Sequence, residues 1–197
     1  LLAMVMVLSM TTAAFAAFTN ANTPASSTAD PQITGVAKET TAMTAYSVIT
    51  ATDDTKGVVT YHLEDWAAAA LAGKQFTVNS TTVTLVKADT SVTPTKYTVD
   101  MDNLITGLGG HWGIKNGQEN QNNSDSKTDT NAILTAIAAG DTSTATETKT
   151  ATGLTTTPPA STEQTATFTG LEVGYYLVKA TDDVNVYNPM AIAVGLT

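Results

Sequence analysis

The sequence predicts a mainly β protein, an immunoglobulin-like β-sandwich with two short helical insertions and long polar loops. Three observations support this fold class. Threonine makes up about one residue in five, and β-branched residues are common in strands. Several short segments alternate apolar and polar side chains with the two-residue period of a strand. Stretches rich in threonine, serine, glycine and amide side chains separate these segments, as in exposed loops.

Length and charge limit the classes of function. The chain has 197 residues, enough for one domain. Nine basic and 18 acidic side chains give a formal net charge of −9, and every basic residue is a lysine. This balance argues against a nucleic-acid partner, which requires clustered positive charge. The absence of cysteine excludes disulfides, thiolate nucleophiles and cysteine-based metal sites.

The N-terminal segment has the features of a secretory signal peptide. Residues 1–17 form an apolar run too short to span a bilayer, and Ala14-Phe15-Ala16 fits a cleavage site. The charged region that normally precedes such a run is missing. We therefore expect an exported protein with a flexible lead over residues 18–31 and a domain over residues 32–197 that is truncated at its C-terminus.

Alternating segments predict strands in the first half of the chain. In the strand expected over Thr41–Thr50, Met43, Ala45 and Ile49 would share one face, with Tyr46 and Val48 on the other. The other strands expected here are Ile33–Val36, Gly57–Leu63, Phe76–Lys87 with a turn at Asn79-Ser80, and Lys96–Val99.

Two short helices are also predicted. One covers Trp66–Ala72, with Asp65 as its cap and Gly73 as its end. The other covers Asn131–Ala139, and its apolar face consists of Ile133, Leu134 and Ile137.

The second half combines polar excursions with three strands. Residues 107–129 and 141–163 are expected to be exposed loops because glycine, amide and hydroxyl side chains dominate them. Strands are expected over Thr165–Thr169, Gly174–Ala180 and Pro189–Leu196.

Four motifs, in this order, carry a family resemblance. The segments Thr44–Ile49 (TAYSVI), a helix over Asp129–Ala139, Thr167–Val178 (TFTGLEVGYYLV) and Asn188–Val194 (NPMAIAV) follow one another. Together they resemble the N-terminal domain of the major backbone pilins that sortases assemble in Gram-positive bacteria. The resemblance covers roughly residues 30–197.

The resemblance implies a structural subunit of a surface fimbria used in adhesion. Such subunits are exported to the cell wall, and their partners are other pilin subunits and the sortase that joins them covalently. Neither a Tyr-Pro-Lys motif nor an LPxTG signal occurs in this sequence. Polymerisation by a sortase is therefore implied by the resemblance alone.

The resemblance also implies an intramolecular Lys–Asn isopeptide bond. A buried lysine loses its charge and becomes a nucleophile, while a nearby carboxyl polarises the asparagine amide. The candidate lysine is Lys38, near the first strand. The candidate asparagine is Asn188, with Asn185 as the fallback.

The assisting acid of such a bond is less defined. Glu172 and Glu163 flank the middle strand pair, and Glu147 lies further away in the sequence. Simpler roles compete with this chemistry: Lys38 can be a solvated turn residue, and Asn188 can be a turn residue before a proline.

The sequence does not indicate an enzyme, and we expect no cofactor and no resident metal. His62 and His111 are isolated, and neither a nucleophile elbow nor a phosphate-binding loop occurs. The aspartate pairs at 53–54 and 182–183 are adjacent, so as strand neighbours they would point to opposite faces. A weak Ca²⁺ site in these loops stays open.

An alternative function is a monomeric adhesin or surface-layer domain. In that case Tyr61, Trp112 and the long loops would form a site for a host glycan or a host protein. An adhesin and a shaft subunit can share this fold and composition.

Overall fold

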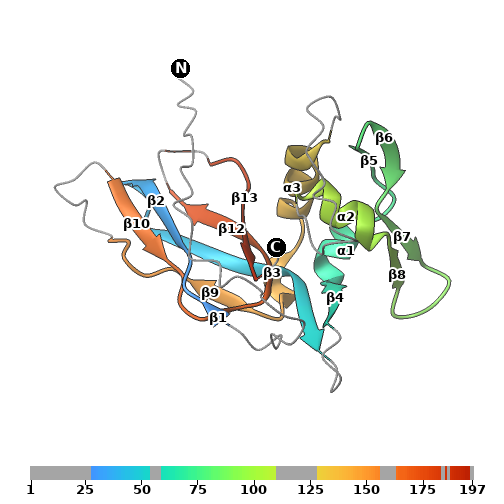
Figure 1. Cartoon of the computed structure of the whole chain (residues 1–197), viewed down its shortest axis with the longest axis horizontal. Coiled ribbons are helices and arrows are strands. Elements are labelled where there is room, and N and C mark those ends of the chain that lie inside the picture. The colour runs from blue at the N-terminus through green and yellow to red at the C-terminus, as the bar shows by residue number, and fades with distance from the viewer. Residues whose placement is uncertain are drawn as a thin grey trace, which may run out of the picture.

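The computed structural model shows a mainly β chain with several antiparallel sheets and three short helices (Figure 1). The residues that it describes are 28–53, 59–109, 128–155, 163–182, 185 and 187–195. The predicted signal peptide, the first part of the predicted lead, and most of the loop expected at 107–129 lie outside these residues. None of the helices within them is long and apolar enough to cross a membrane.

The elements follow one another along the chain in this order: β1 (Thr28–Ala29), β2 (Gln32–Ala37), β3 (Ala42–Asp53), β4 (Val59–Leu63), α1 (Asp65–Leu71), β5 (Gln75–Val78), β6 (Thr81–Thr84), β7 (Val86–Asp89), β8 (Lys96–Val99), α2 (Met101–Gly107), α3 (Thr130–Ala138), the 3₁₀ turn η1 (Thr142–Thr144), β9 (Thr148–Thr150), β10 (Glu163–Thr167), β11 (Leu171–Glu172), β12 (Gly174–Thr181) and β13 (Met190–Val194).

The central sheet has the strand order β13-β12-β3-β4, and β9 pairs with β3 on the same side as β4. All of these pairings are antiparallel. Strands β1 and β2 pair with β11 and β10, so the start of the described chain pairs with its last third. Figure 1 shows the long β3 running from this group of strands toward the helices.

One apolar cluster, which we call the helix-side core, lies between the central sheet and the insertion over residues 64–147. Trp66 and Leu71 of α1 and Ile133 and Ile137 of α3 are buried in it, together with Leu177 of β12. Hairpins β5-β6 and β7-β8 contribute Phe76, Val78 and Val86 to the same cluster. The insertion therefore covers one face of the central sheet.

The opposite face of the sheet is covered by a second cluster, the strand-side core. Tyr176 and Val178 of β12 and Met43 of β3 pack there against β2 and β10. Phe168 and Leu171 complete it, and both are fully buried. Because both faces of β12 are covered, five consecutive residues from Gly174 to Val178 are buried.

A bulge in β3 corrects the predicted faces of this strand. Met43 and Ala45 belong to the strand-side core, and Tyr46 and Val48 to the helix-side core, as expected. Ile49 was expected beside Met43 but lies in the helix-side core. The β3–β12 register shifts between Tyr175 and Tyr176, whose partners are Ile49 and Ser47, and the extra residue reverses the alternation.

The predicted helices form with small shifts. α3 covers the predicted segment and buries Ile133, Leu134 and Ile137 as expected. Asp65 is the first residue of α1, and Glu64 occupies the cap position. The third helix, α2, was not predicted. The Asp100 side chain accepts a hydrogen bond from Asn103 N and starts it.

Three short strands were also missed. β9 lies inside the predicted excursion 141–163, where threonine-rich composition indicated only a loop. β1 and β11 have two residues each, too few to show a period. β1 thus lies inside the lead predicted over residues 18–31, and next to it Gly170 N donates to Asp30 Oδ1 at 2.7 Å.

Gly174 gives a test of the tight contact between β12 and β3. A Cβ at this position would lie 2.5 Å from the carbonyl oxygen of Ile49, closer than the backbone allows. We expect Gly174→Ala to lower the free energy of unfolding by about 1–3 kcal/mol, the usual cost of overpacking. Urea denaturation measures it, with the exposed Thr148→Ala as control. Equal midpoints for both variants would contradict the packing described.

Candidate functional site

Lys38 lies on the surface, in the turn between β2 and β3. Its Nζ is 3.8 Å from Glu39 Oε1, and the side chains are 44% and 34% exposed. The amine of a lysine becomes a nucleophile more readily when burial removes it from water. This conformation therefore lacks the burial that a nucleophilic Lys38 needs.

The other sequence candidates are spread over the strand group. Asn188 is exposed, just before β13. Glu163 is exposed and lies opposite Ala37 in the β10–β2 pair, which puts it near the Lys38 turn. Glu172 is exposed and lies opposite Thr28, in a different strand pair. Of Glu163 and Glu172, only Glu163 is thus close in register to Lys38.

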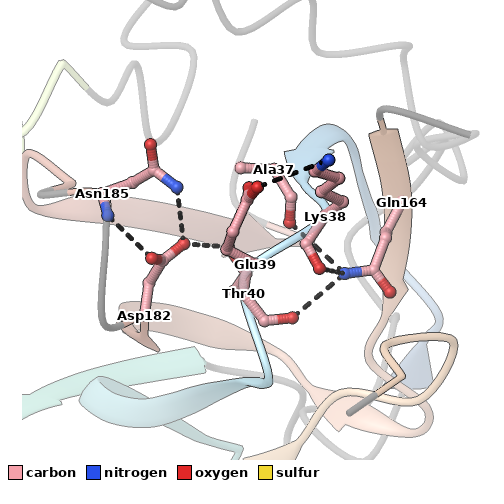
Figure 2. A network of polar contacts seen from close by, with 7 residues as sticks. All are labelled: Ala37, Lys38, Glu39, Thr40, Gln164, Asp182 and Asn185. Carbon is pink, nitrogen blue, oxygen red and sulfur yellow. Dashed lines mark hydrogen bonds and ion pairs between the residues drawn. The ribbon is translucent and has the colours of Figure 1, made fainter. Parts of the chain in front are cut away.

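The turn that carries Lys38 is fixed by a buried amide. Gln164 of β10 donates from Nε2 toward three backbone carbonyl oxygens, those of Ala37, Lys38 and Thr40, at 3.1 to 3.3 Å. Its Oε1 accepts from Thr155 N at 2.9 Å. Figure 2 shows the amide pointing into the turn. Both the Nε2 and the Oε1 atom of Gln164 therefore form hydrogen bonds with the main chain.

A fully buried hydroxyl connects the same turn to the chain that follows β12. Thr40 Oγ1 donates to Asp182 Oδ2 at 2.8 Å and lies 2.5 Å from the Tyr187 hydroxyl. Because Thr40 has one hydroxyl proton, Tyr187 is the donor in the second contact. Ala37 N in turn donates to the Tyr187 oxygen at 3.3 Å. Each group in this series thus donates to the next, from Ala37 N through the two hydroxyls to the Asp182 carboxylate.

Asn185, the fallback asparagine, joins this network. Its backbone N and its Nδ2 donate to the two carboxylate oxygens of Asp182 at 2.7 and 3.0 Å (Figure 2). We call Ala37, Thr40, Gln164, Asp182, Asn185 and Tyr187 the turn network. It brings together the Lys38 turn and Asn185, and its carboxylate is Asp182 instead of Glu172 or Glu163.

A second polar group, the Ser47 network, lies where β3 changes its partner from β9 to β4. Ser47 is fully buried, and its Oγ donates to Glu64 Oε1 at 2.9 Å and accepts from Glu147 N at 3.0 Å. Its carbonyl oxygen accepts from Trp66 Nε1 at 3.0 Å. Thr146 Oγ1 donates to the other oxygen of Glu64. This network ties the insertion to the central sheet at both of its ends.

Glu147 is the most enclosed of the three acids named from the sequence. Its side chain is 16% exposed, and Oε2 accepts from the Tyr176 hydroxyl. Oε1 is buried without a hydrogen-bond partner, 3.9 Å from Lys149 Nζ. Burial, and then the contact with Glu147, raise the pKa of Tyr176 well above its usual value. Glu147 therefore accepts a hydrogen bond from a tyrosine of the strand-side core and helps to raise its pKa.

The residues considered for ligand binding are scattered. His62 is exposed on β4, with Nε2 3.2 Å from Thr52 Oγ1. Tyr61 packs against the helix-side core, and burial raises its pKa. His111 and Trp112 lie outside the described residues, as do Asp54 and Asp183. Within the described ranges, no three His, Cys, Asp or Glu side chains gather as metal ligands.

Sequence reasoning missed the residues that organise both networks. Thr40, Ser47 and Gln164 look like ordinary polar residues of strands or turns, and Asp182 was considered only as half of an adjacent pair. Each becomes important because segments more than 100 residues apart converge on it, or because it is buried. A one-dimensional pattern carries no signal for either property.

Comparison with known proteins gives no further assignment: no protein-family model, curated protein or solved structure matches this chain.

Removing the Thr40 hydroxyl tests the turn network. Thr40→Val keeps the shape of the side chain but leaves Asp182 and Tyr187 without their shared partner. We expect a loss of about 1–3 kcal/mol in the free energy of unfolding, the cost of unpaired buried polar groups. Thr41→Val is the matched control, since Thr41 is exposed and its hydroxyl donates at 3.3 Å to a carbonyl oxygen. Equal urea midpoints for the two variants would refute the role of Thr40.

The buried tyrosines predict a loss of stability in alkali. The pKa values of Tyr175 and Tyr176 are raised in the folded chain, first by burial. Above about pH 10 the unfolded chain releases these protons and the folded chain does not, so stability falls as pH rises. Tyr176→Phe should make the fall between about pH 10 and 12 shallower. Denaturant titrations at each pH measure it, and parallel curves would contradict the assignment.

Proposed function

We propose that this chain is a structural subunit of a bacterial surface fimbria, exported and joined to its neighbours by a sortase. The observation that carries the proposal is the arrangement of the resembling motifs. TAYSVI lies in β3, GYYLV in β12 and PMAIAV in and just before β13. These three strands are neighbours in the order β13-β12-β3. Three of the four motifs, dispersed over about 150 residues, thus form one continuous part of the fold, an arrangement that supports a β-sandwich pilin domain.

The use of polar side chains supports the same proposal. In the turn and Ser47 networks, carboxylates, amides and hydroxyls join strands that are far apart in sequence. This arrangement stabilises the chain as a building block. It suits a protein whose role is mechanical support, in which strands from the start and the end of the domain must stay together.

Covalent polymers provide the direct test of this proposal. In a bacterium that exports this chain, cell-wall extracts boiled in detergent should give a ladder of high-mass species that an antibody to residues 28–195 detects. Deleting the sortase gene should collapse the ladder to the monomer. A single monomeric band in the parent strain would contradict the proposal and favour a monomeric adhesin or surface-layer protein.

The mass of the folded chain decides whether Lys38 forms an isopeptide bond. Because Lys38 is exposed, we expect the mass of the purified domain to equal that of its sequence, in wild type and in Lys38→Ala alike. A wild-type mass lower by one ammonia, with no such loss in Lys38→Ala, would show that the bond forms. The same comparison with Asn185→Ala and Asn188→Ala would then identify the acceptor. The fimbrial proposal does not depend on this bond.

A further inference from the structure

One side of the central sheet ends in β13 and the other in β4 and the shorter β9, and none of the three has a second strand partner among the described residues. β13 pairs with β12 alone, and β4 pairs with β3 alone. We propose that β13 of one copy pairs with β4 of a second copy, so that one sheet continues through neighbouring molecules. The outward N–H and C=O groups of an edge strand form a template on which another extended chain can pair.

Strand directions in the sheet favour this pairing. β13 is antiparallel to β12, β12 is antiparallel to β3, and β3 is antiparallel to β4. β13 and β4 therefore run in opposite directions within one molecule. A second copy displaced sideways, without being turned over, presents its β4 antiparallel to β13 of the first. A contact between two different surfaces that repeats in this way gives an open chain of subunits.

The two faces of the sheet restrict the register. Met190, Ile192 and Val194 of β13 face the strand-side core, whereas Tyr61 and Leu63 of β4 contact the helix-side core. By alternation Val59 lies on the same face as Tyr61 and Leu63, whereas Thr60 and His62 lie on the strand-side face. Among the antiparallel registers that continue the faces between copies, those that pair most of the two strands place His62 opposite Ile192 or, two residues along, opposite Met190. Any register between these two would exchange the faces.

The absence of charged side chains other than a histidine from both strands favours a second copy of the chain as the occupant. Neither β13 nor β4 contains an acidic or a lysine side chain, so two chains of net charge −9 can approach there without like charges in direct opposition. Two strands of five residues each bury far less than the roughly 1,200 Å² of a stable free complex. The contact therefore suits copies held together by another linkage, which supplies a high effective concentration. In this respect the inference rests on the proposed function.

Cysteine trapping tests the pairing on the purified domain, without the sortase or the cell wall. The chain has no cysteine of its own, so each introduced thiol is unique. His62→Cys is mixed with Ile192→Cys or with Met190→Cys under mild oxidation, and the mixed dimer is counted by mass spectrometry. The control is His62→Cys with Ala191→Cys, because Ala191 lies on the other face. Circular dichroism first establishes that each variant is folded.

We expect at least one strand-side mixture to give several-fold more mixed dimer than the control. The use of both Ile192 and Met190 keeps the test valid if one variant fails to fold. Equal yields in all mixtures would overturn the inference. So would dimers that form in Ile192→Cys or Met190→Cys alone, since they would show that β13 pairs with itself. Either failure leaves the sortase-dependent ladder unaffected, so the two proposals fail separately.

Discussion

The antiparallel pairing of β3 with β12 is the contact on which the rest of the structure depends. Eight residue pairs join these strands, from Gly174–Thr50 to Thr181–Ala42. Each strand presents one face to the helix-side core and the other to the strand-side core. β13, β4 and β9 attach to this pair. Burial of both faces supplies most of the stabilisation, because apolar area removed from water is the main favourable term in folding.

The two polar networks lie beside this strand pair, at positions where regular strand pairing leaves backbone groups to be satisfied by side chains. At Ser47 the outer partner of β3 changes from β9 to β4. Here the Ser47 hydroxyl accepts from Glu147 N and donates to the Glu64 carboxylate, and the Trp66 indole donates to the Ser47 carbonyl oxygen. At the Lys38 turn the carbonyl oxygens point inward, and the Gln164 amide meets them. Buried backbone groups must find partners, so these polar residues are part of the core and hold distant strands together through hydrogen bonds.

The parts of the fold predictable from the sequence are those with a strong local period. GYYLV predicted β12 within one residue, and the spacing of Ile133, Leu134 and Ile137 predicted α3. The bulge that moves Ile49, the three-residue β9 and the seven-residue α2 depend on contacts made only after folding. The site was less predictable still. Lys38 and Asn188 were chosen by position along the chain, but exposure depends on tertiary packing, and both are exposed.

Native-state hydrogen exchange tests most directly whether the β3–β12 pair is the centre of this structure. The amides of Ala45, Leu177 and Val178 should be among the slowest to exchange, with an apparent free energy of opening equal to that of global unfolding. The amides of hairpins β5-β6 and β7-β8 should open at lower free energy, because each is a two-stranded sheet at the outside of the insertion. Hairpin amides that exchanged slowest, with β3 and β12 opening first, would contradict the central role of this strand pair.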